Sequence, residues 1–462
     1  MGRRGEFGLV VAIRSICKLI VTFLAILQDE RWAIRVPTGD LPASHDSVSL
    51  TSTHVDAPCP LPAIPISPTS SAFLPPIPGP YFVHPKAPLT MPTLAAAAAP
   101  LLSVHITTFA DRQFVGIAFP HALVDAKGMG AYVRALAAEL LRETTDSSGY
   151  DLARLGEEVY DVAEVHEASR FDAAVKRVAR ETANEVDADP ARACQEGGIG
   201  WGVTLPAAGN ICRYIKWQAS EWLWHKAEEG GVFLGRELVK LAVDQAKAEV
   251  AEASGGEEWV STEDVLWAWL LKAAYADEPG HRQVRDATAI CCRNLLGLVA
   301  PLHPHNSVLL VASPDVPSPY STPLSDLALF RRRRLHAVRT PAKVAALVRW
   351  SESFWPGRMP LWQAPVHDSW LATSHVASML GTALDLGDGA GAEYVCTARP
   401  RGSQSAIITS KGKDGYTLRG RMSRSRWVSV RAEVAKLQAA YDASLEDGDS
   451  GFEEEVDLVK RV

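Results

Sequence analysis

Apolar and polar residues alternate in two short runs in the first third of the chain. The runs cover residues 104–108 and 115–119, and the polar residues 110–113 separate them. A period of two is typical of β-strands with one buried face, so the stretch predicts a hairpin or a pair of strands. Apolar residues then recur at helical spacing over residues 129–140. We expect residues 120–128 to form a strand-to-helix loop, where a rigid scaffold can present reactive side chains.

The first hundred residues carry three further patterns. Apolar residues at helical spacing predict an amphipathic helix over residues 13–27, and a short strand is expected at residues 31–36. The apolar run also resembles a targeting segment, but Arg14 and Lys18 interrupt it, so we favour a core helix. Residues 57–100 are rich in proline, which predicts irregular or edge structure.

Strands and helices are mixed in the second half. The expected helices span residues 220–228, 235–253, 262–274, 324–336 and 341–350, and the expected strands span residues 214–217, 288–293, 308–312, 406–409 and 416–419. Ser261 and Asp264 form a capping-box pattern at the start of the third helix. We interpret five tryptophans as core residues: Trp217, Trp222, Trp224, Trp267 and Trp269. The arginine run 331–334 is expected to be a solvated helix face, with contact to a phosphate as the alternative.

The length of 462 residues allows two or three domains, and the mixture of elements predicts an α/β or α+β class. We expect an N-terminal domain over residues 1–190 and a glycine-rich crossover linker over residues 191–212. A C-terminal domain then follows over residues 213–445, and an acidic tail over residues 446–462.

Composition narrows the class of partner. Hydrophobic residues make up 47% and charged residues 22%, which is ordinary for a folded protein and argues against a membrane partner. The net charge of −7 argues against nucleic-acid binding, so a small molecule is the expected partner. The seven cysteines are odd in number and lack zinc-site spacing, so we expect no metal and free thiols in a reducing, cytoplasmic compartment.

The most specific chemical signal is a histidine in the expected loop after the hairpin. His121 and Asp125 form an HxxxD string there, and a neutral histidine is the usual general base near neutral pH. For the string alone, a histidine that serves only local structure is the favoured interpretation. In its context, however, the segment 101–141 resembles the core of the BAHD-type acyl-CoA-dependent acyltransferases, especially their fungal members, whose hallmark is HxxxDG after a strand. Ala126 stands where the family prefers glycine.

The family's second motif, DFGWG, is looser in this chain. Asp385, Gly387 and Gly389 keep the aspartate and both glycines, whereas Leu386 and Asp388 replace the aromatic residues. Together with collinear matches elsewhere, the resemblance covers roughly residues 13 to 435. The family's first strand has no counterpart before the first expected helix.

The resemblance implies a two-domain, chloramphenicol-acetyltransferase-like fold with mixed sheets, flanking helices and an interdomain channel. It implies acyl transfer from acyl-CoA, as co-substrate, to an oxygen or nitrogen of a small secondary-metabolite acceptor. His121 would be the general base, and Trp370 would line the site as a donor to the oxyanion. Asp125 would pair with Arg293 and hold the loop. The implied enzyme is a monomer without a permanently bound cofactor.

The resemblance also implies that Asp385, Gly387 and Gly389 support the site by shaping the domain contact. Residues that bind the donor are not assigned. Two alternatives stay open: a degenerate member that binds a ligand without turnover, and a condensation-like enzyme that takes a carrier-protein thioester. Condensation domains usually carry a second histidine just before the motif, and Pro120 occupies that position here.

Overall fold

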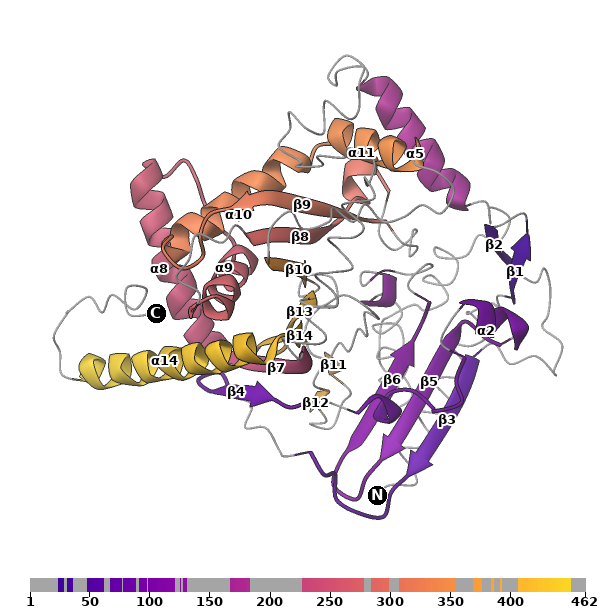
Figure 1. Cartoon of the computed structure of the whole chain (residues 1–462), viewed down its shortest axis with the longest axis horizontal. Helices are drawn as coiled ribbons and strands as arrows, with labels where there is room; N and C mark the ends of the chain where they lie inside the picture. Colours follow the sequence, from indigo (N-terminus) through magenta and orange to yellow (C-terminus); the bar gives the residue numbers. More distant parts are fainter. Residues whose placement is uncertain are drawn as a thin grey trace, which may run out of the picture.

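The structure is a computed structural model, and the part of the chain that it describes is given by these ranges: residues 24–28, 31–35, 48–61, 67–76, 78–88, 91–97, 99–120, 125, 128–130, 167–182, 227–277, 284–298, 307–353, 369–375, 384–385, 391–392 and 406–449. Helices and strands are mixed along these ranges, which confirms the α/β class (Figure 1). No helix in these ranges is both long and apolar enough to cross a lipid bilayer.

A seven-stranded mixed sheet forms the centre of the described structure, in the order β4-β7-β14-β13-β10-β8-β9 (Figure 1). Its strands are β4 (Ser71–Leu74), β7 (Glu228–Gly235), β8 (Val284–Cys291), β9 (Val308–Val316), β10 (Ser369–His375), β13 (Ala406–Lys411) and β14 (Gly415–Met422). Strand β10 runs parallel to β8 and β13, and the other neighbouring pairs are antiparallel.

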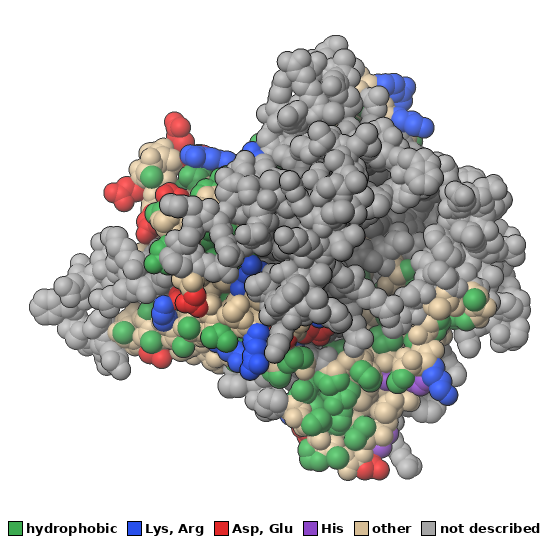
Figure 2. Space-filling view, viewed as in Figure 1, with side chains coloured by type: hydrophobic (Ala, Val, Ile, Leu, Met, Phe, Trp, Pro, Cys, Tyr) green, Lys and Arg blue, Asp and Glu red, His purple; other side chains and the backbone are tan. Residues whose placement is uncertain are grey.

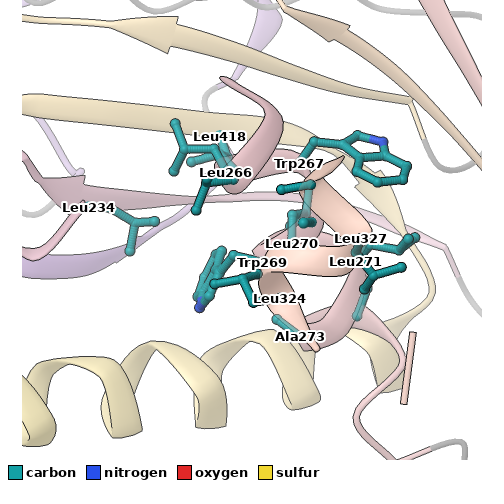
Figure 3. Close-up of a cluster of buried hydrophobic side chains, with 14 of the residues drawn as sticks. Leu234, Leu266, Trp267, Trp269, Leu270, Leu271, Ala273, Leu324, Leu327 and Leu418 are labelled. Carbon is teal, nitrogen blue, oxygen red and sulfur yellow. The ribbon is translucent and has the colours of Figure 1, made fainter. Parts of the chain in front are cut away.

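Four helices pack with β7 and β14 in the largest hydrophobic core: α8 (Arg236–Ser254), α9 (Thr262–Ala274), α10 (Leu324–Val338) and α14 (Arg424–Asp449). Helix α9 is buried along most of its length, and Trp267 and Trp269 lie inside this core (Figure 3). The core assignment is therefore confirmed for these two tryptophans. The capping box of Ser261 and Asp264 is also confirmed, because each side chain accepts the other residue's backbone N–H.

A separate three-stranded sheet contains β3 (Val48–His54), β5 (Leu102–Thr108) and β6 (Gln113–Ala118). Strands β5 and β6 are the antiparallel hairpin that the alternating pattern predicts, and β3 adds a parallel edge. Val104, Ile106 and Ile117 pack together on one face of this sheet. Beside it lie the short helices η1 (Gly79–Tyr81) and α2 (Met91–Ala96).

Two elements from the first 190 residues are built into the second half of the molecule. Strand β4 is the edge strand beside β7, which confirms edge structure in the proline-rich segment. Helix α5 (Glu167–Glu181) packs against α11 (Pro341–Ser353) and η3 (Asn294–Leu296), and its buried residues share a core with theirs. The expected boundary at residue 190 therefore does not separate two independent cores.

Three local expectations need correction. The C-terminal end of the expected helix 13–27 is instead strand β1 (Leu24–Gln28), which pairs with β2 (Arg31–Arg35) in a tight hairpin. The expected helix 220–228 overlaps β7 at Glu228, and its other described residue, Ala227, lies outside any helix. Helix α14 continues to Asp449, so the first residues of the expected acidic tail are helical. The expected linker 191–212 lies outside the described residues.

Candidate active site

The HxxxD aspartate makes a buried bidentate ion pair with an arginine from the other half of the chain. Asp125 follows the end of β6 by seven residues and is 1% exposed, and Arg293 lies between β8 and η3 and is 0% exposed. The Arg293 Nη1 atom lies 2.8 Å from Oδ2 of Asp125, and Nη2 donates to Oδ1 at 2.9 Å. This pairing, which we call the latch, has the geometry of the strongest carboxylate contacts in proteins.

Two backbone amides complete the surroundings of the Asp125 carboxylate. The N–H of Ser307 donates to Oδ2 and the N–H of Gly128 donates to Oδ1, each at 3.0 Å. Asp125 also accepts the N–H of Met129 on its backbone carbonyl, so it caps the start of the helix expected over residues 129–140. The Asp125 side chain therefore caps the helix and also connects its start to the second half of the chain through Arg293 and Ser307.

Two of these hydrogen-bond donors, Arg293 and the N–H of Ser307, come from the second half of the chain and lie where β8 ends and β9 begins. The N–H of Cys292 donates to the carbonyl of Ser307, which extends the pairing of β8 and β9 by one step. Arg293 and Ser307 are thus held next to each other by the sheet itself. Gly297 ends η3 with a φ of +70°, a left-handed conformation that glycine adopts at little cost. The turn after Arg293 is therefore fixed by local sequence.

The electrostatics of the latch favour the charged forms of both partners. Burial by itself raises the pKa of Asp125, but the hydrogen bonds from Arg293, Ser307 and Gly128 outweigh burial and hold the pKa below its usual value. Burial lowers the pKa of Arg293, and the hydrogen bond and charge of Asp125 outweigh that effect and raise it. The carboxylate is therefore an anchor that stays ionised, and it cannot serve as a proton carrier near neutral pH.

Two neighbouring cysteines adjoin the latch: Cys291 is the last residue of β8, and Cys292 directly follows it. Arg293 Nη1 also donates to the Cys291 sulfur at 3.3 Å. Cys292 is fully buried, and burial raises the pKa of its thiol to about 12. A thiol with so high a pKa is neutral at physiological pH and is a poor nucleophile. Cys292 therefore packs in the core shared by α5 and α11, and it is not a candidate for covalent catalysis.

The candidate base itself, His121, lies outside the described residues, but its chain neighbours are placed. Pro120 precedes it directly, and Asp125 follows four residues later. Four residues of chain reach at most about 14 Å. The loop that carries His121 therefore begins at the three-stranded sheet and ends at the latch, so both ends of the loop are fixed.

Trp370 lies on the seven-stranded sheet, near the start of β10. Its backbone is opposite Arg285 on β8, and Cys291 at the latch lies six positions further along β8. At about 3.3 Å per residue this separation is roughly 20 Å along the strand. The structure does not bring the Trp370 backbone beside the latch, and its role as a donor to the site stays a prediction.

The residues of the second motif are only partly described. Asp385 lies in β11 (Leu384–Asp385) and is opposite Gly391 of β12 (Gly391–Ala392) in a small antiparallel pair. Gly387 and Gly389 lie outside the described residues. Support of the site by this motif therefore stays a prediction.

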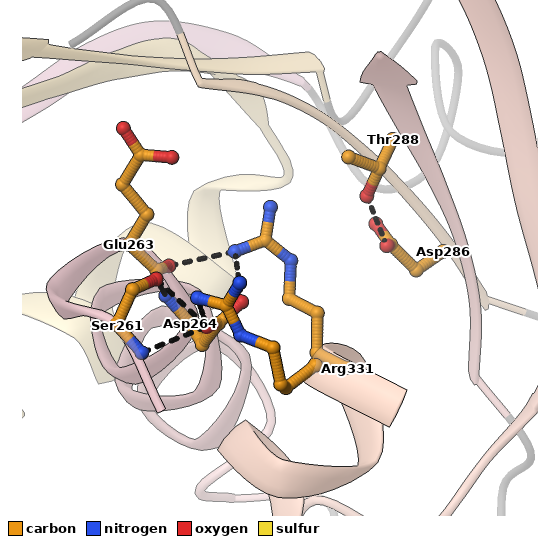
Figure 4. Close-up of polar contacts among 7 residues, drawn as sticks. Ser261, Glu263, Asp264, Asp286, Thr288 and Arg331 are labelled. Atoms are coloured by element: carbon orange, nitrogen blue, oxygen red, sulfur yellow. Dashed lines mark hydrogen bonds and ion pairs between the residues drawn. The ribbon is translucent and has the colours of Figure 1, made fainter. Parts of the chain in front are cut away.

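The arginine run on α10 is occupied by contacts within the protein. Arg331 is 4% exposed, donates to the carbonyl of Glu263 at 2.7 Å and contacts Asp264, as Figure 4 shows. Arg332 also pairs with Asp264, and Arg333 pairs with Glu258. The expectation of a solvated face is wrong for Arg331, because the capping carboxylate of α9 draws it into the interior. Through these hydrogen bonds and ion pairs, Arg331 and Arg332 connect α10 to the N-terminal end of α9.

Sequence reasoning missed the two amide donors and the sulfur contact. The signal available for Gly128 was the aspartate three residues earlier, a typical helix N-cap. Nothing in the local pattern pointed to Ser307 or Cys291. Within the described ranges, no group of three or more His, Cys, Asp and Glu side chains could hold a metal ion.

Comparison with known proteins identifies the fold. No protein-family model and no curated protein matches the chain by sequence. Among solved structures, F. sporotrichioides TRI101 with coenzyme A and T-2 is similar at a TM-score of 0.60 and 14% identity, over 92% of this chain and 89% of that one. F. graminearum TRI101 with coenzyme A and deoxynivalenol gives 0.60 and 14%, over 93% and 88%. Vinorine synthase gives 0.50 and 11%, over 95% and 86%.

The chain has the fold of the BAHD-type acyltransferases. TRI101 and vinorine synthase both belong to that family, so the resemblance seen in the sequence is confirmed at the level of the fold. The similarity extends over most of each chain.

Proposed function

We propose that the chain is an acyl-CoA-dependent acyltransferase in which His121 is the general base. The observation that carries the proposal is the latch. Asp125 is turned away from solvent into a bidentate contact with Arg293, and two amides hold it as well. An HxxxD aspartate held in this way serves as an anchor, so the histidine of the same loop is left to do the chemistry.

The reaction follows from the chemistry of the histidine. Neutral His121 takes the proton from a hydroxyl or amine of the acceptor while the oxygen or nitrogen attacks the thioester carbonyl. General-base help of this kind contributes about 10²–10⁴-fold in rate. The tetrahedral intermediate collapses with cleavage of the C–S bond, and the coenzyme A thiolate takes the proton back from His121. Atoms and charges balance without a covalent enzyme intermediate.

The proposed donor is an acyl-CoA and the proposed acceptor is a small alcohol or amine of secondary metabolism. Support comes from TRI101 of the same fold, whose structures contain coenzyme A with T-2 or with deoxynivalenol. The proposal includes a cytoplasmic location, with which the free thiols of Cys59, Cys291 and Cys292 agree, and a monomeric state. Trp370 is proposed to donate to the oxyanion, and Asp385, Gly387 and Gly389 to shape the donor channel.

Two measurements test the proposal. Calorimetry with coenzyme A and acetyl-CoA measures the donor site without knowledge of the acceptor, and micromolar binding is expected. Release of free thiol from acetyl-CoA in the presence of a panel of alcohols and amines then measures turnover. We expect His121→Ala to abolish turnover, to leave the melting temperature within a few degrees, and to keep donor binding.

His54→Ala is the matched control, because His54 is an exposed histidine at the end of β3 that pairs with Asp56 in the same half of the molecule. It should retain full turnover. Normal thiol release by a folded His121→Ala protein would refute the role of His121. Absence of donor binding by a folded wild-type chain would instead favour the degenerate or carrier-dependent alternatives.

A further inference from the structure

A short segment crosses the three-stranded sheet on the face opposite its hydrophobic core. We call residues 78–88, which include η1, the strap. Side chains of one strand alternate between two faces, so Thr51, His105 and Gly116 lie on the face opposite Val104 and Ile117. Figure 2 shows hydrophobic side chains gathered over this end of the molecule. The strap therefore covers part of the three-stranded sheet. Strand β6 of this sheet leads into the loop that carries His121.

Aromatic side chains hold the first part of the strap. The rings of Tyr81 and Phe109 are 5.0 Å apart, and those of Phe82 and Phe114 are 5.6 Å apart, both edge to face. The backbone of Phe82 also lies directly on Gly116 of β6, where a Cβ atom would come within 1.9 Å of the Phe82 carbonyl oxygen. This part of the strap is therefore fixed by contacts that do not depend on pH.

A buried histidine lies under the second part of the strap. His105 of β5 is 1% exposed, and its Nδ1 is 2.8 Å from the hydroxyl of Thr51, its register partner on β3. Among the described residues, no group meets hydrogen-bond geometry at its other ring nitrogen, Nε2, although the carbonyl group of Pro80 on the strap acts on the ring. The hydroxyl of Thr107, two residues along the same face, is buried and likewise has no hydrogen-bond partner in the described part of the chain. Buried polar atoms without partners are uncommon and call for an explanation.

The strap places a second histidine against the first. The rings of His84 and His105 lie 5.7 Å apart, and the N–H of Lys86 donates to Nδ1 of His84. Among the described residues, His84 is the titratable group that acts on His105, and Thr51 beside it is neutral. Burial and then the nearby His84 lower the pKa of His105, and the carbonyl groups of Thr51 and Pro80 only partly oppose them.

We propose that His105 is an acid-sensitive pin for the strap. The neutral ring packs under His84, whereas a proton on His105 places a buried cation against a second histidine and releases residues 83–88 from the sheet. Because His105 is the register partner of Gly116, two residues before the end of β6, a proton on His105 also acts on the strand that leads to His121. This last step rests on the proposed function, but the release itself does not.

Hydrogen exchange of the full-length protein, followed by mass spectrometry, tests the pin. Exchange of the peptide covering residues 83–88 is compared at about pH 7.5 and about pH 5.5, after correction for the intrinsic effect of pH. We expect a severalfold acid-induced loss of protection in the wild type and none in His105→Gln, which does not titrate. His54→Gln is the matched control, because it removes an exposed histidine from the same sheet and should behave as the wild type does.

His84→Gln provides a second test that leaves the sheet unchanged. It removes the second imidazole from beside His105, so the acid-induced loss of protection should become smaller. Equal protection of the wild type at both pH values, or an unchanged acid response in both His105→Gln and His84→Gln, would overturn the pin. If His105→Gln does not fold, the response of His84→Gln decides. If the strap opens as expected while no acyl transfer is found, the pin stands and only its link to His121 is lost.

Discussion

At the residue scale, the carboxylate of Asp125 accepts hydrogen bonds from Arg293 and from two backbone amides. Replacing Asp125 by alanine leaves the guanidinium of Arg293 buried without its partner and the amides of Ser307 and Gly128 without an acceptor. We expect a loss of about 3–5 kcal/mol in the free energy of unfolding, together with lower soluble yield and activity. Asp244→Ala, which removes an exposed partner of Lys240, should cost about 0.5 kcal/mol or less. Urea unfolding of both variants measures the difference.

The same carboxylate predicts how stability responds to acid. Because the folded state lowers the pKa of Asp125 below its ordinary value of about 3.9, the stabilisation is fully present above that value and is lost as pH falls below it. Asp125→Asn should therefore show a flatter fall in unfolding free energy below about pH 4 than the wild type. Parallel acid profiles for the two proteins, or normal melting of Asp125→Ala with selective loss of turnover, would contradict an anchoring role.

At the element scale, one glycine decides whether the strap can lie on β6. A methyl group at position 116 would overlap the Phe82 carbonyl, and a backbone atom cannot move aside as the end of a flexible side chain can. Gly116→Ala should therefore cost roughly 1–3 kcal/mol and expose the strap to exchange at all pH values. The control is Gly412→Ala, because a Cβ there meets nothing closer than 3.7 Å. Melting of the two variants would show the contrast, and equal melting temperatures would argue against the close contact.

Elements with a strong local signal were predictable from the sequence, and elements set by distant partners were not. The β5–β6 hairpin and the capped start of α9 follow from alternation and from Ser261 with Asp264. Strand β7 was missed because its first residues are glutamates and glycines, which give no alternation. Strand β10 lies between two parallel neighbours, and strands in parallel pairing commonly lack a period of two in the sequence. The short apolar run at β1 fits either a helix or a strand, and its partner β2 decided between them.

The candidate site shows the same division. The loop after the hairpin and the cap at Asp125 could be inferred locally, whereas Arg293 is 168 residues away, and only the family resemblance suggested the pair. The resemblance also suggested Trp370, whose backbone the structure places far along β8 from the latch. A motif identifies the chemistry of a residue, but the register of a sheet fixes its position.

At the scale of the whole molecule, the exchange of elements between halves predicts how the chain unfolds. Val175 of α5 belongs to the first half, yet it is buried in the core of the second half with Leu347 of α11. Phe73 of β4 likewise packs edge to face on Trp427 of α14, with ring centres 5.7 Å apart. The first half therefore cannot lose the structure of β4 and α5 without exposing cores of the second half.

Calorimetry should accordingly show one transition, with the calorimetric and van't Hoff enthalpies equal, although chains of this size often unfold in steps. Val175→Ala should lower the stability measured for that single transition by roughly 2 kcal/mol. Val243→Ala in α8, a matched change in the largest core, should shift the same transition by a similar amount. If two transitions appear and each variant moves only one of them, the halves unfold separately. In that case β4 and α5 dock on a second half that is already complete, and the latch would then have to hold two independent domains together.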